Sequence, residues 1–187
     1  MLIVGENLRS LIRQRNIVEQ HCSSCFDENS ITLSLDREII QIKAPEGTVL
    51  HYGQDIPKEY LEAKVLREES LLIGPKCAVL GCSSEKITFP MGYFGLLQTK
   101  GSVARMFVSV NCCDGQIEGG FTGKITFEIV NHSNYTIAVQ PLHPVAQLFV
   151  FKTSSRYANP YDGRYQGASC PTVQLPKDRR FADRSGK

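Results

Sequence analysis

Two carboxylates near the middle of the chain, Glu118 and Glu128, lie in patterns that suit proton transfer. Glu118 precedes two glycines in the segment 116–121, and a carboxylate on such a tight turn can reach a sugar hydroxyl, a water or a metal-bound water. Glu128 lies in the run 124–130, where apolar residues alternate with mostly polar ones, as in a half-buried strand. A carboxylate in mid-strand needs either open water or a partner. Taken singly, the two residues would also fit an exposed turn and an exposed strand position.

The turn 100–105 carries groups that could bind oxyanions. Lys100 and Arg105 supply cations at its two ends. Gly101 permits close approach of the backbone to a ligand, and Ser102 offers a hydroxyl. Gly-Ser turns with basic flanks are common in proteins of every class, so this turn alone does not indicate a site.

Two segments nearer the C-terminus could complete a site for an anionic, aromatic ligand. Gln147 is an amide within an apolar run and needs hydrogen-bond partners if it is buried. The segment 161–167 places Arg164 between Tyr161 and Tyr165, so it could close over a ligand like a lid. The alternative for this segment is a disordered tail that happens to hold two tyrosines.

The cysteine pattern does not favour a zinc site. A structural zinc site takes about four ligands, usually from two closely spaced pairs, and the cluster His21, Cys22 and Cys25 has no second C-x-x-C pair to complete it. We therefore expect Cys22 and Cys25 to be packing or loop residues. The seven cysteines are irregularly spaced and include the adjacent pair 112–113, so we expect reduced thiols, as in an intracellular protein.

Length and composition indicate one globular domain. The 187 residues are 42% apolar and 21% charged, which is ordinary for such a domain. A net charge of +2 gives no support to binding of a nucleic-acid polymer, and no apolar run is long enough to span a membrane. The first residues lack the features of a signal peptide, so we expect a cytoplasmic protein. We expect residues 1–176 to form the domain and residues 177–187 to form a flexible charged tail.

The elements that must position these groups are mostly short strands. One amphipathic helix is predicted over residues 6–15, and one helical turn is possible at 57–61. Apolar or alternating runs, separated by turn residues, then predict many short strands and hence a barrel or a sandwich. The predicted strands are 31–35, 39–42, 64–66, 70–73, 77–80, 86–89, 94–97, 105–110, 124–130, 136–139 and 146–151.

The order and spacing of these motifs resemble those of the dCTP deaminase / dUTPase family. The matching segments read GCSSEKITFP, KGSVAR, QIEGGFTGKITFEI, AQL and RYQGA, and the resemblance extends over residues 1 to about 175. It is strongest with the dCTP deaminases and with the archaeal enzymes that both deaminate dCTP and hydrolyse the product. GGFTGKITFEIVN is the most specific of the matching pieces.

The resemblance implies a mainly β fold, a distorted β-barrel or jelly-roll with a short N-terminal helix. It implies a homotrimer with nucleotide sites between subunits, and a deoxynucleoside triphosphate that carries Mg²⁺ on its phosphates rather than on protein ligands. Zinc is not used. The implied reaction is the deamination of dCTP to dUTP and ammonia; the alternative is dUTP pyrophosphatase activity, alone or as a second activity. In relatives, dTTP acts as an inhibitor, so it is a further candidate ligand.

The matched positions also imply roles. Glu128 would be the acid/base of deamination, and Glu118 would contact the deoxyribose and activate water for dUTP hydrolysis. Ser102 and Arg105 would bind phosphate and shape the base pocket. The other residues expected to bind substrate are Lys100, Gly101, Gln116, Ile117, Gln147, Tyr161, Arg164, Tyr165 and Gln166.

Several positions depart from the family pattern. Lys100 replaces an arginine and loses its bidentate fork, while Gly101 replaces a serine and loses a hydroxyl. Glu118 stands for an aspartate, which moves the carboxylate by about one methylene. Ser34 and Ala168 stand where the family has an aspartate and a glutamine. These departures leave open a third hypothesis, a nucleotide-binding trimer without catalytic activity.

Overall fold

The computed structural model describes residues 1–19, 25–51, 54–155 and 159–173. The predicted tail, the domain boundary at 176 and the cluster's His21 and Cys22 lie outside these ranges. The predicted N-terminal helix is confirmed as α1 (Gly5–Arg15), which buries Leu8, Leu11 and Ile12 on one face. The helix ends at Asn16, whose backbone is left-handed with φ of 48°.

The rest of the fold is mainly β, as predicted. One five-stranded sheet has the order β1-β2-β12-β7-β9, a second has the order β4-β3-β6-β10-β8, and β5 pairs with β11. The strands of the first sheet are β1 (Phe26–Asp27), β2 (Ser30–Ser34), β12 (Pro144–Lys152), β7 (Tyr93–Thr99) and β9 (Gln116–Ile117). Those of the second are β4 (Leu61–Val65), β3 (Glu38–Ile42), β6 (Ala78–Thr88), β10 (Thr122–Asn131) and β8 (Val108–Ser109), and the pair comprises β5 (Leu71–Ile73) and β11 (Ile137–Val139).

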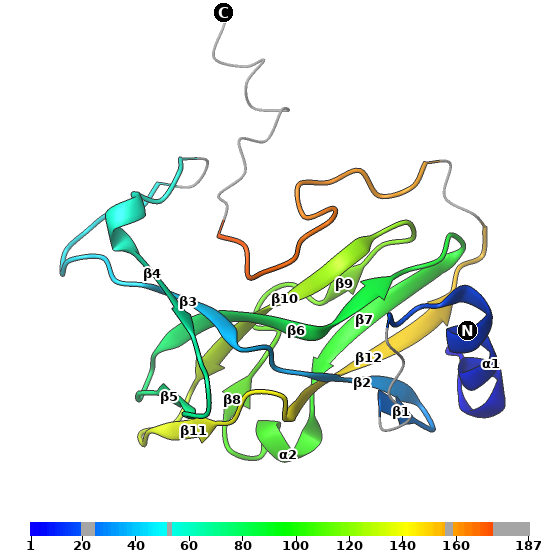
Figure 1. The fold of residues 1–187 in the computed structure, drawn as a ribbon, viewed down its shortest axis with the longest axis horizontal. Helices are drawn as coiled ribbons and strands as arrows, with labels where there is room; N and C mark the ends of the chain where they lie inside the picture. Colours follow the sequence, from blue (N-terminus) through cyan, green and yellow to red (C-terminus); the bar gives the residue numbers. More distant parts are fainter. Residues whose placement is uncertain (20–24, 52–53, 156–158, 174–187) are drawn as a thin grey trace, which may run out of the picture.

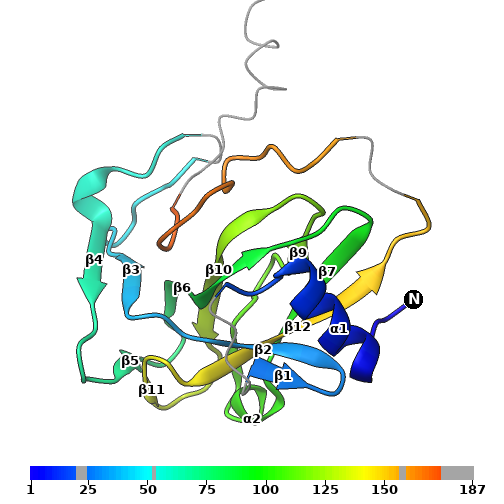
Figure 2. The same cartoon turned by 45° about the vertical axis from the view of Figure 1, so that its right-hand side comes forward.

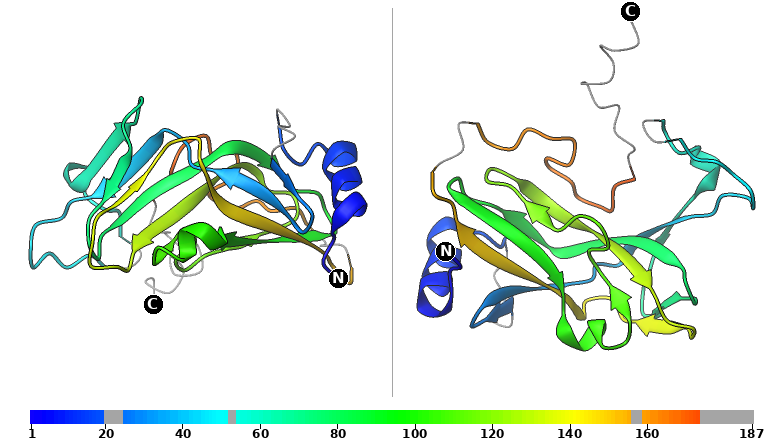
Figure 3. Two further views of the ribbon diagram at one scale, coloured as in Figure 1. Left: turned by 90° about the horizontal axis from the view of Figure 1, so that it is seen from below. Right: turned by 180° about the vertical axis from the view of Figure 1, so that it is seen from behind.

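The sheets are open, so the closed barrel expected from the resemblance is not found among the described residues. The edge strands β1, β8 and β9 are only two residues long, which leaves too little backbone to continue the pairing around a closed ring. Buried side chains of the two larger sheets pack into one hydrophobic core. Beyond their common body, β4 and the loop that precedes it extend to one side (Figure 3).

Local structure differs from expectation after β7. The predicted strand 105–110 is reduced to the two residues of β8, because the helical turn α2 (Gly101–Ala104) continues into a turn at residues 105–107. The amides of Val103 and Ala104 donate to the carbonyl of Lys100, at 2.9 Å each. Phe107 then takes a left-handed backbone with φ of 60° before the strand begins. The turn predicted at 57–61 is confirmed as the 3₁₀ helix η2 (Lys58–Tyr60).

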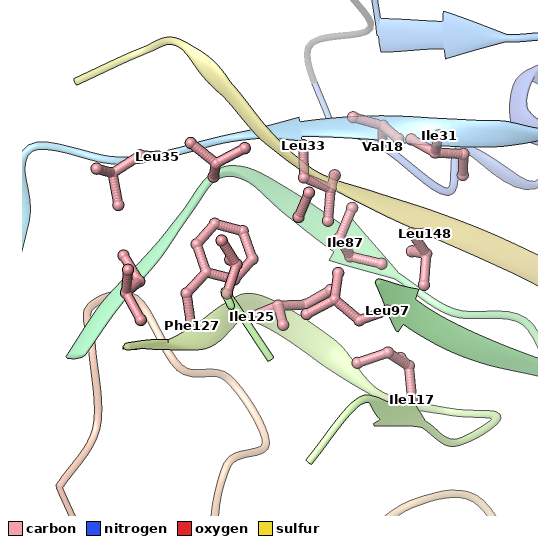
Figure 4. Packing of buried hydrophobic residues seen from close by; sticks show 14 of the residues in the cluster. Val18, Ile31, Leu33, Leu35, Ile87, Leu97, Ile117, Ile125, Phe127 and Leu148 are labelled. Atoms are coloured by element: carbon pink, nitrogen blue, oxygen red, sulfur yellow. The ribbon is translucent and has the colours of Figure 1, made fainter. Parts of the chain in front are cut away.

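A single hydrophobic core fills the space between the two large sheets. Ile125, Phe127 and Ile129 project from one face of β10 into this core, and each is at most 5% exposed. Figure 4 shows Phe127 and Ile125 beside side chains of β2, β6 and β12, including Leu33, Ile87 and Leu148. The predicted alternation along β10 is therefore confirmed. It leaves Lys124, Thr126 and Glu128 on the opposite face.

The C-terminal segment 159–173 passes over the end of the molecule near β9 and β10 (Figures 1 and 2). Backbone hydrogen bonds fasten it there: the amide of Tyr161 donates to Gly119 at 3.0 Å, and the amide of Lys124 donates to Ala168 at 2.7 Å. This segment and β10 are the two elements that build the site. In the described part of the chain, no helix is both long enough and apolar enough to cross a membrane.

Candidate active site

A cavity of about 400 Å³ lies between the polar face of β10, the turn before it and the C-terminal segment. Cavities of roughly 300–1,000 Å³ suit small-molecule ligands. Six of the residues predicted from the sequence line it: Gln116, Ile117, Glu118, Glu128, Tyr161 and Tyr165. The structure thus gathers both candidate carboxylates and both tyrosines around one space.

Glu128 is half-buried in mid-strand and its carboxylate has a defined partner. The amide of Cys113 donates to its Oε2 at 2.8 Å. The amide of Cys112 donates to the Glu128 carbonyl at 3.3 Å, so the same short loop fixes both the main chain and the side chain of this residue. The exposed strand position considered as the alternative is wrong, because the carboxylate faces the cavity.

Glycine is required in the turn that carries Glu118. Gly120 has φ of +95°, and a Cβ there would lie 2.6 Å from the Cβ of Pro160 and 2.8 Å from the amide nitrogen of Tyr161. Gly123 has φ of +150°, and its Cβ would lie 2.8 Å from the amide nitrogen of Ala168. Both glycines therefore let the C-terminal segment approach the turn closely. The segment becomes one wall of the cavity for this reason.

Aromatic side chains line that wall. Tyr161 and Phe121 form an edge-to-face pair with ring centroids 5.8 Å apart and planes at 66°. Burial raises the pKa of the Tyr161 hydroxyl, and the charge of Glu118 adds to the effect. Tyr161 is therefore a neutral hydrogen-bonding group at neutral pH. Together with Ile117 and Ile125, the two rings offer flat and apolar surface suited to a planar base.

The polar floor of the cavity contains an ion pair that sequence reasoning missed. Lys124 lines the cavity from β10, two residues before Thr126 and on the same face of the strand. Its ammonium pairs with the carboxylate of Asp36. The Asp36 carboxylate also accepts from the thiol of the buried Cys82, at 3.8 Å. Burial lowers the pKa of Lys124, but the hydrogen bond and the charge of Asp36 outweigh it, so the net shift is upward. The ion pair fixes the Lys124 ammonium beside the cavity, with its charge balanced by Asp36.

The predicted oxyanion-binding turn lies away from this cavity in the single chain. Gly101, Ser102 and Arg105 belong to α2 and its end, and all three are exposed, while Lys100 precedes them and is half-buried. The guanidinium of Arg105 donates to the Gly101 carbonyl at 3.1 Å. None of the four lines the cavity, so their predicted role is not met within one protomer.

The remaining predicted residues have other contacts. Gln147 donates to Asp27 at 3.0 Å and to Ser30 at 3.3 Å, which holds β12 to the β1–β2 hairpin. Gln166 accepts from the amide of Thr122 at 2.9 Å and donates to the Gly120 carbonyl at 3.0 Å. It therefore supports the glycine turn. Arg164 is exposed on the C-terminal segment and does not line the cavity.

Residues 2–153 match the sequence model of a known protein family, which is described as "dCTP deaminase-like". The match covers most of the chain, including β10 and the turn that carries Glu118. The chain belongs to the dCTP deaminase-like family.

Curated relatives span nearly the whole chain. A "dCTP deaminase, dUMP-forming" from Corynebacterium diphtheriae is 36% identical over 178 residues, covering 92% of this chain and 95% of that protein. A protein of the same name from Corynebacterium kroppenstedtii is 29% identical over 179 residues, covering 92% of this chain and 96% of that protein. Both names specify dUMP as the product, whereas the resemblance in the motifs alone implied dUTP.

A solved structure shows the same fold. The 2′-deoxycytidine 5′-triphosphate deaminase from Agrobacterium tumefaciens superimposes with a TM-score of 0.62 at 16% identity. The superposition covers 80% of this chain and 47% of that longer chain. This likeness supports the mainly β architecture of the family.

The donor atoms at the cavity of this deaminase-like protein suit a hard cation brought in by a ligand. Asp114, Glu118 and Glu128 all line it with carboxylate oxygens, the ligand type that Mg²⁺ prefers. Among the described residues, no three side chains of the metal-binding types converge closely enough to hold an ion themselves. The three carboxylates therefore fit a hard cation such as Mg²⁺ by ligand type.

Sequence reasoning missed several cavity residues besides Lys124. Thr126 shares the face of Glu128, and the alternation along β10 was a sufficient signal for both Lys124 and Thr126. Thr172 also lines the cavity, and its hydroxyl lies 3.1 Å from that of Thr126. Thr172 and Asp36 carried no signal, because each reaches the site only through a contact between segments far apart in the chain.

Proposed function

We propose that this protein is a zinc-independent dCTP deaminase that goes on to release pyrophosphate and forms dUMP. The observation that carries the proposal is the carboxylate of Glu128, held by the Cys113 amide and facing a cavity that also contains Glu118. Acid/base catalysis needs a positioned carboxylate within reach of the reacting atoms, and a strand fixes its position better than a loop does.

In the deamination step, Glu128 takes a proton from a water molecule that attacks C4 of the cytosine. The C4–oxygen bond forms as the C4=N3 double bond becomes single, Glu128 returns its proton to the exocyclic nitrogen, and the second hydrogen of the water ends on N3. The C–N bond then breaks, ammonia leaves and the base becomes uracil. Phe121, Tyr161 and Ile117 provide the flat and apolar surface that orients the ring during this step.

In the hydrolytic step, Glu118 activates a second water, which attacks the α-phosphorus of the uracil nucleotide. The bond from that phosphorus to the bridging oxygen breaks and pyrophosphate leaves. One dCTP and two waters thereby give dUMP, ammonia and pyrophosphate. Mg²⁺ on the phosphates would neutralise their charge, while the Lys124 ammonium, paired with Asp36, could donate a hydrogen bond at the cavity.

The choice of dUMP as product is supported by the relatives named dUMP-forming, which align with 92% of this chain. It is also supported by the presence of Glu118 in the same cavity as Glu128. Deamination that stops at dUTP is the second candidate, since Glu118 replaces the aspartate expected at its position. The methylene by which they differ displaces the carboxylate, and about 1 Å of displacement can cost roughly 10²-fold in rate.

We also propose that the active form is a homotrimer in which the α2 turn of one protomer completes the cavity of the next. Arg105 and Ser102 are exposed and lie outside the cavity of their own chain, so a neighbour could bring them to the phosphates. Closed symmetric assembly would also cover the open edges of the two sheets.

The test is a panel of dCTP, dUTP, CTP and dCMP with Mg²⁺, assayed separately for ammonia and for pyrophosphate. The proposal predicts that dCTP yields both products in equal amounts, together with dUMP. Ammonia without pyrophosphate would instead support the product dUTP. Tight binding of a deoxynucleotide with neither product would favour the non-catalytic hypothesis, and would overturn the proposal.

A further inference from the structure

Two adjacent thiols lie directly beside the proposed catalytic carboxylate. Cys112 and Cys113 are exposed in the loop 110–115, between β8 and β9, with their sulfur atoms 3.7 Å apart. The amide of Cys113 donates to Oε2 of Glu128 at 2.8 Å, and the amide of Cys112 donates to the Glu128 carbonyl. The backbone that carries this pair of thiols is thus the backbone that positions Glu128.

The other described cysteines lack this combination of exposure and proximity. Cys82 is buried, and burial raises the pKa of its thiol to about 12, which keeps it protonated and unreactive. Cys25 is half-buried and its thiol donates to Glu85, while Cys77 and Cys170 are exposed but neither adjoins another cysteine in the sequence. Among the described cysteines, residues 112 and 113 are therefore the pair that we expect to form a disulfide on oxidation.

The charges at the pair suit a two-step oxidation. The thiol of Cys113 donates a hydrogen bond to the sulfur of Cys112, and this bond raises the pKa of Cys113. The charges of Cys112 and Glu128 raise the pKa of Cys113 further. Cys113 is therefore held as a neutral thiol beside the sulfur of Cys112. One nucleophilic sulfur then stands next to one resolving sulfur.

We propose that Cys112 and Cys113 form an oxidative modification site at which a hydroperoxide produces a vicinal disulfide that withdraws support from Glu128. The thiolate of Cys112 attacks one oxygen of the hydroperoxide, the O–O bond breaks and a sulfenic acid forms. The sulfur of Cys113 then attacks that of Cys112, the S–O bond breaks and water leaves. The two thiols lose two electrons and two hydrogens, and the hydroperoxide is reduced; from hydrogen peroxide the products are two waters.

Closing this disulfide must move the loop backbone. Consecutive Cα atoms are about 3.8 Å apart across a trans peptide, whereas disulfide-bonded residues usually have Cα atoms roughly 4.4–6.8 Å apart. The peptide between the two cysteines must therefore change its geometry, and this peptide contains the amide that donates to Glu128. Strained and exposed disulfides are readily reduced, so a thiol reductant would restore the original loop.

The effect on activity rests on the proposed function, whereas the modification itself does not, and the experiment separates the two. Reduced protein is treated with hydrogen peroxide, free thiols are alkylated, and the peptide that contains residues 112 and 113 is weighed. Ammonia release from dCTP is measured before oxidation, after it, and after reduction with a phosphine. The variants are Cys112→Ser, which cannot form the disulfide, and Cys77→Ser, the matched control that loses an exposed thiol elsewhere.

The expected result is a peptide lighter by two hydrogens, with ammonia release about 10²-fold slower and restored by the reductant, as for loss of a positioned catalytic group. Cys77→Ser should respond as the unaltered protein does, while Cys112→Ser should keep the activity of its own reduced form. Absence of the internal disulfide would overturn the modification site. A complete disulfide without loss of activity would overturn the link to Glu128. If the reduced protein releases no ammonia at all, the proposed function fails. The mass of the peptide that contains residues 112 and 113 still shows whether the disulfide has formed.

Discussion

At the scale of single residues, the site depends on how Glu128 and Glu118 are held. Glu128 comes from the middle of a long strand and has an amide partner, so its carboxylate is fixed in place. Glu118 comes from a turn that is held by Gly120, Gln166 and the C-terminal segment. Two carboxylates with separate supports can serve two separate reactions, which underlies the assignment of deamination to one and hydrolysis to the other.

Glu118→Gln should separate these two reactions. Without a carboxylate to activate water, pyrophosphate release should fall by about 10²–10⁴-fold, the usual contribution of a general base. Ammonia release from dCTP should continue, because Glu128 is unchanged. The measurement is the ratio of the two products, with Glu59→Gln as a control for an exposed glutamate on η2. An equal loss of both products would contradict the separate roles.

Cys82 should make the stability of the fold depend on alkaline pH. Burial raises the pKa of its thiol from 9.0 to about 12, with a further contribution from the charge of Asp36. Between these values the unfolded thiol loses its proton and the folded one keeps it. The free energy of unfolding should therefore fall as pH rises from 9.0 towards 12, by up to about 1.4 kcal/mol per pH unit from this group.

Cys82→Ala should remove that component. Urea unfolding in the presence of a reductant, from about pH 8 to about pH 11, would measure both slopes. The variant should start less stable, because it leaves a small cavity, but its free energy of unfolding should fall less steeply with pH. Parallel slopes for the two proteins would show that the thiol is not protonated in the folded state as claimed.

At the scale of elements, β10 and the C-terminal segment together form the cavity. The alternation along β10 could be predicted from the sequence. That pattern was enough to place Glu128, Lys124 and Thr126 on one face, opposite Phe127. The packing of the C-terminal segment could not be predicted from the sequence, because it depends on backbone hydrogen bonds and glycine contacts rather than on side-chain periodicity. A turn at residues 100–105 was expected, but its helical form, α2, was not, since its residues have no apolar pattern of their own.

Gly120→Ala should detach the C-terminal segment from the turn. A methyl group there would meet the backbone of Tyr161 and the ring of Pro160, neither of which can yield easily. Hydrogen exchange at the amides of Tyr161 and Gly167 should become faster, since both donate to the turn or to β10. The KM for the nucleotide should rise by about tenfold, equivalent to about 1.4 kcal/mol of binding.

Gly47→Ala is the matched control for that change. Gly47 also has a positive φ, of +79°, but a Cβ there would have no neighbour within 4 Å. This variant should cost about 1 kcal/mol of stability through its backbone and leave both exchange and KM unchanged. Similar effects from the two variants would mean that backbone strain, and not contact with the segment, explains the loss.

At the scale of the whole molecule, the mainly β class and the family could be inferred from the sequence, whereas the open arrangement of the sheets could not. The shortness of β8 follows from the turn at residues 105–107, which continues from α2 and occupies the start of the predicted strand. The separation of Arg105 and Ser102 from the cavity is likewise a property of the folded chain. It is the reason that the proposed trimer matters for function.

Mixed trimers offer a direct test of that assembly. Light scattering should give three times the 20.9 kDa of one chain. Arg105→Ala and Glu128→Gln proteins, each inactive alone, should regain activity when unfolded together and refolded as a mixture. About a quarter of the sites would then combine an intact Arg105 from one protomer with an intact Glu128 from another. No recovery in a mixture that does form trimers would place both residues in the same protomer's site.

The most direct test of the central claim is the rate of ammonia release from dCTP by Glu128→Gln, measured with Mg²⁺ present and with the folded state verified by circular dichroism. Glutamine keeps the size and the hydrogen bond from the Cys113 amide but cannot take a proton. We expect a rate lower by about 10²–10⁴-fold with binding of dCTP retained. Ammonia release at the rate of the unaltered protein would contradict it.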